Sequence, residues 1–222
     1  MVDTSTPDPT AEREEDQPGD DGDDSIVLPW WQHPLNIVTL LVAGALVGAM
    51  IGWLVADARS GPASSDVDVG FLQDMREHHE QALAMSFIYL DLPDTEPGLR
   101  VVARGITMGQ GIEIGRMIQM LRDMDADEAN LGDTAMTWMG MSSEVGAMPG
   151  MASSAELDEL STAAGAEADR LYVELMTEHH IGGIEMAEYA AQNATNAEVR
   201  AMATGMVDGQ LGEIVEMRQL LD

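Results

Sequence analysis

Two histidine pairs, each set between methionines, are the residues of this chain whose types and spacing suit metal chemistry. The stretch "MREHHEQALAM" covers residues 75–85, and "MTEHHIGGIEM" repeats its spacing at residues 176–186. The motif residues are Met75, His78, His79 and Met85 in the first copy and Met176, His179, His180 and Met186 in the second. Imidazole nitrogen and thioether sulfur both bind metal ions, so all eight side chains are candidate metal ligands.

Two glutamates are predicted to lie inside the same assembly. Each helical residue turns by about 100°, which puts Gln110 with Glu113, and Gln210 with Glu213, on one interior stripe. An unpaired buried carboxylate is costly, so each glutamate needs a partner, and histidines across the bundle are available. Such pairs either hold the two halves together without a metal or add Glu113 and Glu213 to the candidate ligands. The two symmetric His pairs flanked by Met favour the metal.

The donor types favour copper over iron or zinc. Thioethers are soft donors that suit Cu(I), while imidazole suits copper and zinc alike. Di-iron helical bundles use Glu-x-x-His motifs, but Met75 and Met176 stand three residues before His78 and His179. The number of hard ligands is therefore low for iron, and copper is the preferred metal.

The elements that must position these residues are four long helices made from one duplicated hairpin. Apolar periodicity predicts helices at about 66–91, 96–124, 153–192 and 195–221. Residues match in register between the halves, with an offset of 101 in the motif helices and 100 in their partners. Neither hairpin can bury its apolar stripe alone. We therefore predict an all-α four-helix bundle at 66–222, with repeat 1 at 66–124, a crossover at 125–152 and repeat 2 at 153–222.

The crossover and two helical glycines raise further expectations. The crossover carries five methionines, Met136, Met139, Met141, Met148 and Met151, which form either a second soft-metal patch or packing at the bundle. Gly182 and Gly183 lie inside a predicted helix at a cost of about 1 kcal/mol each relative to Ala. The sequence predicts that a backbone approaches closely there, or that space is needed beside His179 and His180.

The first 65 residues predict a membrane anchor. Residues 1–29 form an acidic tail, with ten Asp or Glu in the first 24 positions, and are predicted to be disordered. Residues 30–57 form the anchor, because 35–56 contain no charged residue and 22 helical residues span about 33 Å. Trp30 and Trp31 suit a membrane–water interface. Residues 58–65 are a short linker. The protein is predicted to be a single-pass protein of the cell membrane.

The composition excludes several partners and kinds of site. The net charge of −30 opposes nucleic acid and anionic lipid surfaces, so no nucleic-acid partner is predicted. The absence of cysteine excludes disulfides and thiolate metal sites. The partners that remain are a metal ion, the membrane through 35–56, and a second copy of the chain. Gly-x-x-x-Gly spacing at Gly105 and Gly109, and at Gly205 and Gly209, leaves a homodimer open.

The chain resembles the family catalogued as domain of unknown function 305, a ferritin-like helical group. Its signature is similar to Asp-x-x-Phe-Leu-x-x-Met-x-x-His-His-x-x-Ala-x-x-Met-Ala, which begins here at Asp68 and again at Asp169. The first copy ends on Ser86, and the second has Tyr172 for Phe and Gly183 for Ala. The CopM-like members of the family are exported copper-binding proteins. The resemblance therefore implies a ferritin-like fold, copper at the His and Met residues, and a bundle outside the cytoplasm.

Three functions remain open at this stage. Metal binding and sequestration is preferred to catalysis, and no catalytic residue is predicted. Hydrolase and kinase functions have no support, since no nucleophile triad or phosphate loop is present. The second is a ferritin-like oxidase that uses iron or copper at His and Glu. The third is a metal-free interaction module whose His–Glu network fixes the register of the hairpins.

Overall fold

The computed structural model describes residues 29–59 and 63–221, with side chains from 29–55 and 63–221. The described residues are mostly helical and contain six α-helices. They divide into an N-terminal unit and a C-terminal unit. The predicted disordered tail lies, except for Pro29, outside the described residues, as do linker positions 60–62.

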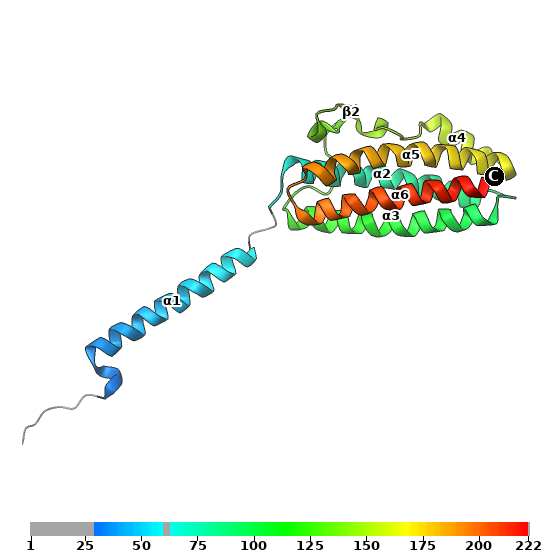
Figure 1. Cartoon of the computed structure of the whole chain (residues 1–222). Coiled ribbons are helices and arrows are strands. Elements are labelled where there is room, and N and C mark those ends of the chain that lie inside the picture. The colour runs from blue at the N-terminus through cyan, green and yellow to red at the C-terminus, as the bar shows by residue number, and fades with distance from the viewer. Residues whose placement is uncertain (1–28, 60–62, 222) are drawn as a thin grey trace, which may run out of the picture. The chain divides into compact units, whose positions relative to one another are not determined.

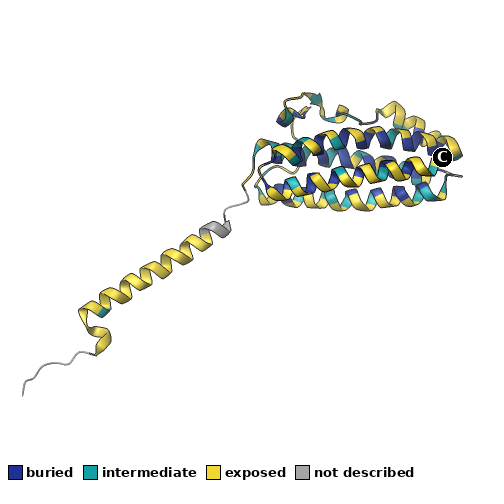
Figure 2. Cartoon of the chain, viewed as in Figure 1, coloured by how far each residue is buried: buried dark blue, intermediate teal, exposed yellow. Residues whose placement is uncertain are grey.

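The N-terminal unit is one apolar helix preceded by a short turn. The 3-10 helix η1 covers Trp30–Gln32 and α1 covers Pro34–Arg59. Within α1, Pro34–Val55 is long and apolar enough to cross a membrane, and none of it is buried inside the protein. Figure 2 shows this helix as almost wholly exposed. Length and composition therefore agree with a spanning segment or a signal anchor.

In the C-terminal unit four long helices lie side by side (Figure 1). They are α2 (Asp66–Asp91), α3 (Pro97–Asp123), α5 (Gly165–Asn193) and α6 (Ala197–Leu221). The helix α2 packs mainly on α3, and α5 packs mainly on α6. The two hairpins meet chiefly through α2 and α5. This arrangement brings the two histidine-bearing helices together at the centre.

One predicted helix is two helices in the structure. In place of a helix at 153–192, α4 (Ser154–Thr162) ends before Ala163 and α5 begins at Gly165. Gly165 has a φ of 55°, and its N–H donates to the carbonyl oxygen of Pro93. The left-handed backbone turns the chain, so that α4 can bury Leu160 while α5 packs with the other long helices.

Two aspartates from the repeated motif join the hairpins reciprocally. The Asp68 carboxylate accepts the backbone N–H groups of Thr195 and Asn196, in the turn before α6. Asp169 accepts the backbone N–H of Glu96, in the turn before α3, and the Tyr89 hydroxyl. Each hairpin therefore anchors the turn of the other. Burial would raise the pKa of Asp68, but hydrogen bonds from Ser65, Thr195 and Asn196 outweigh it and lower that pKa.

The apolar interior consists of two clusters, one on each side of the histidines. Phe71 and Met75 belong to the first cluster, and Ala82 and Met85 to the second. Figure 2 shows buried positions running along the facing sides of the helices. One face of α2 is interior along the whole motif, because all its members are buried: Phe71, Met75, His78, Ala82 and Met85.

The crossover is an ordered cover along the helices. It contains a two-residue hairpin, β1 (Thr134–Ala135) with β2 (Ser143–Glu144), and two short 3-10 helices, η2 (Thr137–Met139) and η3 (Val145–Ala147). Met136 and Met148 are buried, and Met139 and Met151 pack on the same cluster. Met141 is exposed. The crossover methionines therefore act mainly as packing.

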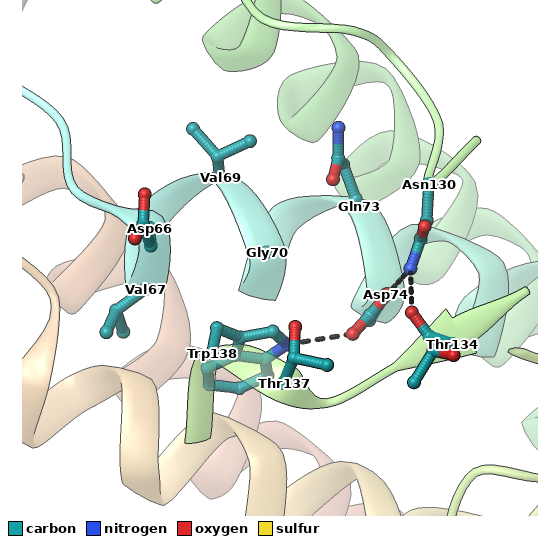
Figure 3. A pocket seen from close by; sticks show the side chains of 10 residues that line it. All are labelled: Asp66, Val67, Val69, Gly70, Gln73, Asp74, Asn130, Thr134, Thr137 and Trp138. Atoms are coloured by element: carbon teal, nitrogen blue, oxygen red, sulfur yellow. Dashed lines mark hydrogen bonds between the residues drawn. The ribbon is translucent and has the colours of Figure 1, made fainter. Parts of the chain in front are cut away.

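A buried aspartate fastens the crossover to α2. Asp74 accepts the indole N–H of Trp138 at 2.8 Å and the amide of Asn130 at 3.0 Å (Figure 3). It also accepts the backbone N–H of Met136 at 2.7 Å. Leu175 occupies the matching place in the second repeat. The duplication therefore gives no hint of this contact.

Candidate metal centre

The four histidines of the two motifs form one buried layer at the middle of the four helices. His78, His79 and His180 have no exposed surface, and His179 is 1% exposed. The rings of His78 and His179 lie face to face, with centroids 3.8 Å apart and an interplanar angle of 31°. The two repeats therefore meet directly through their histidines.

Each histidine is held through its Nε2 atom by an oxygen. His78 bonds to the carbonyl oxygen of Pro149 at 3.1 Å, and His179 to the main-chain oxygen of His78 at 2.9 Å. His79 bonds to Glu113 Oε2 at 2.8 Å, and His180 to Glu213 Oε2 at 2.6 Å. Carbonyl and carboxylate oxygens only accept hydrogen bonds, so each Nε2 carries the proton and donates it.

The other ring nitrogen is bare in all four rings. A neutral imidazole protonated on Nε2 has its lone pair on Nδ1. All four Nδ1 atoms are buried, and none has a hydrogen-bond partner among the described residues. Burying an unpartnered acceptor costs about 1–3 kcal/mol. The layer thus presents four unused nitrogen lone pairs, the form of imidazole that binds metal ions.

The environment keeps the central pair neutral. Burial lowers the pKa of His78 to about 3, and the charge of His79 acts in the same direction. Burial also holds the pKa of His179 well below its ordinary value, with His78 and His180 contributing. Both rings are therefore unprotonated on Nδ1 at neutral pH.

The His–Glu pairs form, but not between the halves as expected. His79 on α2 bonds to Glu113 on α3, and His180 on α5 bonds to Glu213 on α6, so each pair lies within one hairpin. The expectation that they connect the hairpins was wrong. A hairpin places its own two helices closest together, and α3 and α6 make much less contact with the opposite half.

The crossover breaks the two-fold symmetry of the layer. The counterpart of the His179 bond would join His78 to the main chain of His179, but His78 bonds to Pro149 instead. An ideal Cβ on Gly182 would lie 1.9 Å from the Pro149 oxygen, and one on Gly150 would lie 2.3 Å from the Glu178 oxygen. The predicted close approach at Gly182 is confirmed. Sequence reasoning missed Pro149 as a histidine partner, although "MPGM" at residues 148–151, before the second copy of the motif, was the available signal.

The motif methionines lie on both sides of the histidine layer. All four are fully buried. Met75 and Met186 share one apolar cluster, and Met85 and Met176 share the other. Each cluster thus receives one thioether from each repeat. Among the described residues, no three His, Asp or Glu side chains gather closely enough to hold one metal ion. A metal at this layer would therefore depend on thioethers as well as imidazoles.

A wider pocket than any space at the histidines lies where α2 meets the crossover. It has a volume of about 530 Å³ and lies beside Asp74, Asn130 and Trp138 (Figure 3). The polar groups that Figure 3 joins by dashed lines already bond to one another. This pocket therefore has less unused bonding capacity than the histidine layer.

Comparison with known proteins places these features in a family context. Residues 68–221 match the family model described as "Domain of unknown function (DUF305)". A DUF305 protein from Streptomyces coelicolor, described as a candidate secreted protein, has a similar structure, with 40% identity and a TM-score of 0.63. The match covers 69% of this chain and 91% of that one. No curated protein matches the sequence.

Two further solved structures are similar. A DUF305 fragment from Deinococcus radiodurans is 29% identical, with a TM-score of 0.60, over 72% of this chain and 98% of that one. CopM in its Cu(I)-bound form is 26% identical, with a TM-score of 0.51, over 68% of this chain and 93% of that one. The Cu(I) is a property of that relative.

Proposed function

We propose, from the premise that this chain belongs to the DUF305 family, that it is a membrane-anchored protein that binds and sequesters copper outside the cytoplasm. The observation that carries the proposal is the set of four buried Nδ1 atoms without partners, in rings fixed by their Nε2 bonds. The relative CopM, which has a Cu(I)-bound structure, supports copper as the metal. No catalytic step is part of the proposal.

The ligands we propose are the imidazoles and the motif thioethers. His78 and His179 lie face to face, and Met75 and Met176 stand one helical turn before them on the same faces. Met85 and Met186 complete a thioether pair on each side of the layer. Bound copper would supply a soft acceptor for these donors, which suits Cu(I).

Glu113 and Glu213 take a different role from the one that the sequence first favours. Each carboxylate accepts the Nε2–H of its own histidine, as second-layer carboxylates do for metal-binding imidazoles. We propose that they orient His79 and His180 and increase the basicity of Nδ1. They are positioning residues in this account, and the ligands are the four histidines and four methionines.

The proposal includes a ferritin-like four-helix bundle and a single membrane span. The four long helices and their pairing support the bundle. The apolar segment Pro34–Val55 supports the span, and the description of the Streptomyces relative favours the outer side for the bundle. Cleavage by an externally added protease in intact cells tests this orientation, because only an exported bundle would be digested.

A Cu(I) competition titration tests the metal. The full-length chain in detergent is titrated against a chromophoric Cu(I) chelator. Met75→Leu with Met176→Leu removes two thioethers while keeping their volume, at a cost usually below about 1.5 kcal/mol. We expect Cu(I) affinity to fall at least tenfold. The matched control is Met108→Leu with Met141→Leu, two exposed methionines, and it should bind as the parent does.

The same titration separates this proposal from the structural alternative. A metal-free interaction module is supported by the complete set of Nε2 bonds, which hold the helices together without any ion. If the parent binds no Cu(I) in competition with the chelator, the histidines are structural. Binding that survives loss of both thioethers would also contradict the proposed soft site.

A further inference from the structure

A small hollow between α3 and α6 is lined by two glutamines that have no part in the copper proposal. Its volume is about 70 Å³. The repeats contribute matching residues to it: Gln110 with Gln210, Glu113 with Glu213, and Gly109 with Gly209. We call it the Gln/Glu hollow. On its inner side the Gln210 carboxamide reaches α5, where its oxygen would lie 2.6 Å from an ideal Cβ on Gly183.

The two glutamines of the hollow have no partner for their side chains. Gln110 is 4% exposed and Gln210 is 5% exposed. The oxygen and nitrogen of both carboxamides are buried and lack hydrogen-bond partners among the described residues. Buried polar groups are almost always satisfied in native proteins. Four such atoms around one hollow therefore indicate an occupant that bonds to them.

The charge of the lining selects a cation. Glu113 and Glu213 are 29% and 28% exposed, and the imidazoles engage only the Oε2 atom of each. The second carboxylate oxygen of each is a further donor for an occupant. No arginine is among the lining residues described for the hollow. Two carboxylates with no balancing cation attract a positive ion.

The hollow is open to an ion from outside. An ideal Cβ on Gly109 or Gly209 would meet no atom within 4 Å, so no side chain covers the opening at those positions. A water molecule takes up about 30 Å³ of liquid volume. The hollow therefore has room for one ion together with about one or two waters.

We infer that the Gln/Glu hollow binds one hard divalent cation, of the Ca²⁺ or Mn²⁺ class. The ligands are the carboxamide oxygens of Gln110 and Gln210 and the carboxylates of Glu113 and Glu213, with water completing the shell. An all-oxygen set is what hard cations prefer, while Cu(I) prefers sulfur and imidazole. The inference does not depend on copper binding, because it uses different donors and a different ion.

Manganese binding tests the inference. The metal-free full-length chain in detergent is titrated with Mn²⁺, and free Mn²⁺ is measured by electron paramagnetic resonance. About 0.5 M salt weakens ion binding to the acidic surface, because screening is strong at that concentration. We expect one saturable Mn²⁺ per chain, displaced by Ca²⁺. Absence of a saturable site in the parent would overturn the inference and leave water as the occupant.

Matched glutamine variants locate the site. Gln110→Leu with Gln210→Leu should weaken Mn²⁺ binding at least tenfold. Gln119→Leu with Gln219→Leu changes two exposed, repeat-related glutamines of the same helices and should have no effect. Equal loss in both variants would show that the ion is held by the general surface.

A second readout covers the case in which the leucine variant folds poorly. In the parent protein, bound Mn²⁺ should broaden the side-chain amide NMR signals of Gln110 and Gln210 before those of Gln119 and Gln219. Uniform broadening of all four would contradict the assigned position. Neither measurement includes copper. A negative Mn²⁺ result therefore does not count against Cu(I) binding, and a negative Cu(I) titration does not count against Mn²⁺ binding.

Discussion

His179 donates its Nε2–H to the main-chain oxygen of His78 over 2.9 Å, while the centroids of the two rings lie 3.8 Å apart. The contact joins equivalent positions of the two repeats at the centre of the four helices. It is one-sided, because the Nε2 of His78 bonds to Pro149 in the crossover. The duplication therefore builds a symmetric layer, and the crossover makes its two central histidines different.

The first prediction concerns the histidine tautomers. In the metal-free protein at pH 7, His78, His79, His179 and His180 should all be protonated on Nε2, since each Nε2 faces an accepting oxygen. The ¹⁵N chemical shifts of the imidazole nitrogens measure this. His33, which is exposed, serves as the internal reference for an unconstrained ring. A ring protonated on Nδ1 would contradict the proposed ligand atom.

The second prediction is a loss of stability in mild acid. The folded pKa of His78 is about 3, below the unfolded value of about 6.5, so between these values the unfolded chain binds more protons. Stability then falls as pH drops through 6.5, by about 2 kcal/mol for each such histidine between pH 7 and pH 5. His179 acts in the same direction.

Urea unfolding of the metal-free protein at several pH values measures this effect. A variant with His78→Phe and His179→Phe should show a shallower dependence on pH, because the two groups that resist protonation are gone. His33→Gln should keep the parental slope. An equal slope in the parent and the double variant would mean that the central pair does not resist protonation in the folded state.

The third prediction concerns the glycine beneath the crossover. Gly182→Ala would put a Cβ 1.9 Å from the carbonyl oxygen of Pro149, a backbone atom that can move only with the whole segment. We expect destabilisation of about 1–3 kcal/mol. Gly205→Ala is the matched control, since its Cβ would meet nothing within 4 Å, and it should stabilise α6 by up to about 1 kcal/mol. Thermal unfolding compares them, and equal effects would contradict the close approach.

The fourth prediction concerns the reciprocal aspartates. Asp68→Asn and Asp169→Asn each weaken charge-assisted hydrogen bonds to the opposite hairpin, at a cost of about 1–3 kcal/mol. The Asp68 pKa is lowered in the folded state, so its contribution is present at neutral pH and is lost as pH falls below about 3.8. Asp66→Asn, on an exposed residue, should change little. Denaturant unfolding at pH 7 measures all three, and a result in which Asp66→Asn costs as much would refute this role.

Much of the helical framework could be predicted from local patterns. The bounds of α2 and α6 lie within two residues of the prediction, because apolar periodicity and turn residues encode helices locally. The break between α4 and α5 was missed. It depends on the bond from Gly165 to Pro93, which is 72 residues away in the sequence.

The residues of the candidate site could be predicted, but the hydrogen bonds between them could not. Repetition of Met-x-x-His-His identified the buried residues, and the glycine pair indicated a close approach. The His79–Glu113 bond within one hairpin, and the Pro149 bond to His78, came from packing between elements. The contact of Asp74 with the crossover could not be predicted, because its partners lie in an irregular segment and its repeat counterpart is Leu175.

The sequence by itself determined that the repeated motif residues are interior, that two equivalent hairpins exist, and which donor types they bring, since these follow from period and composition. Only the tertiary structure decided which nitrogen of each histidine is free, because the proton is fixed by whichever oxygen lies opposite Nε2. It also decided that Gln110 and Gln210 share one hollow. Helical period gives the face on which a residue lies, but only the packing of distant helices brings two faces together.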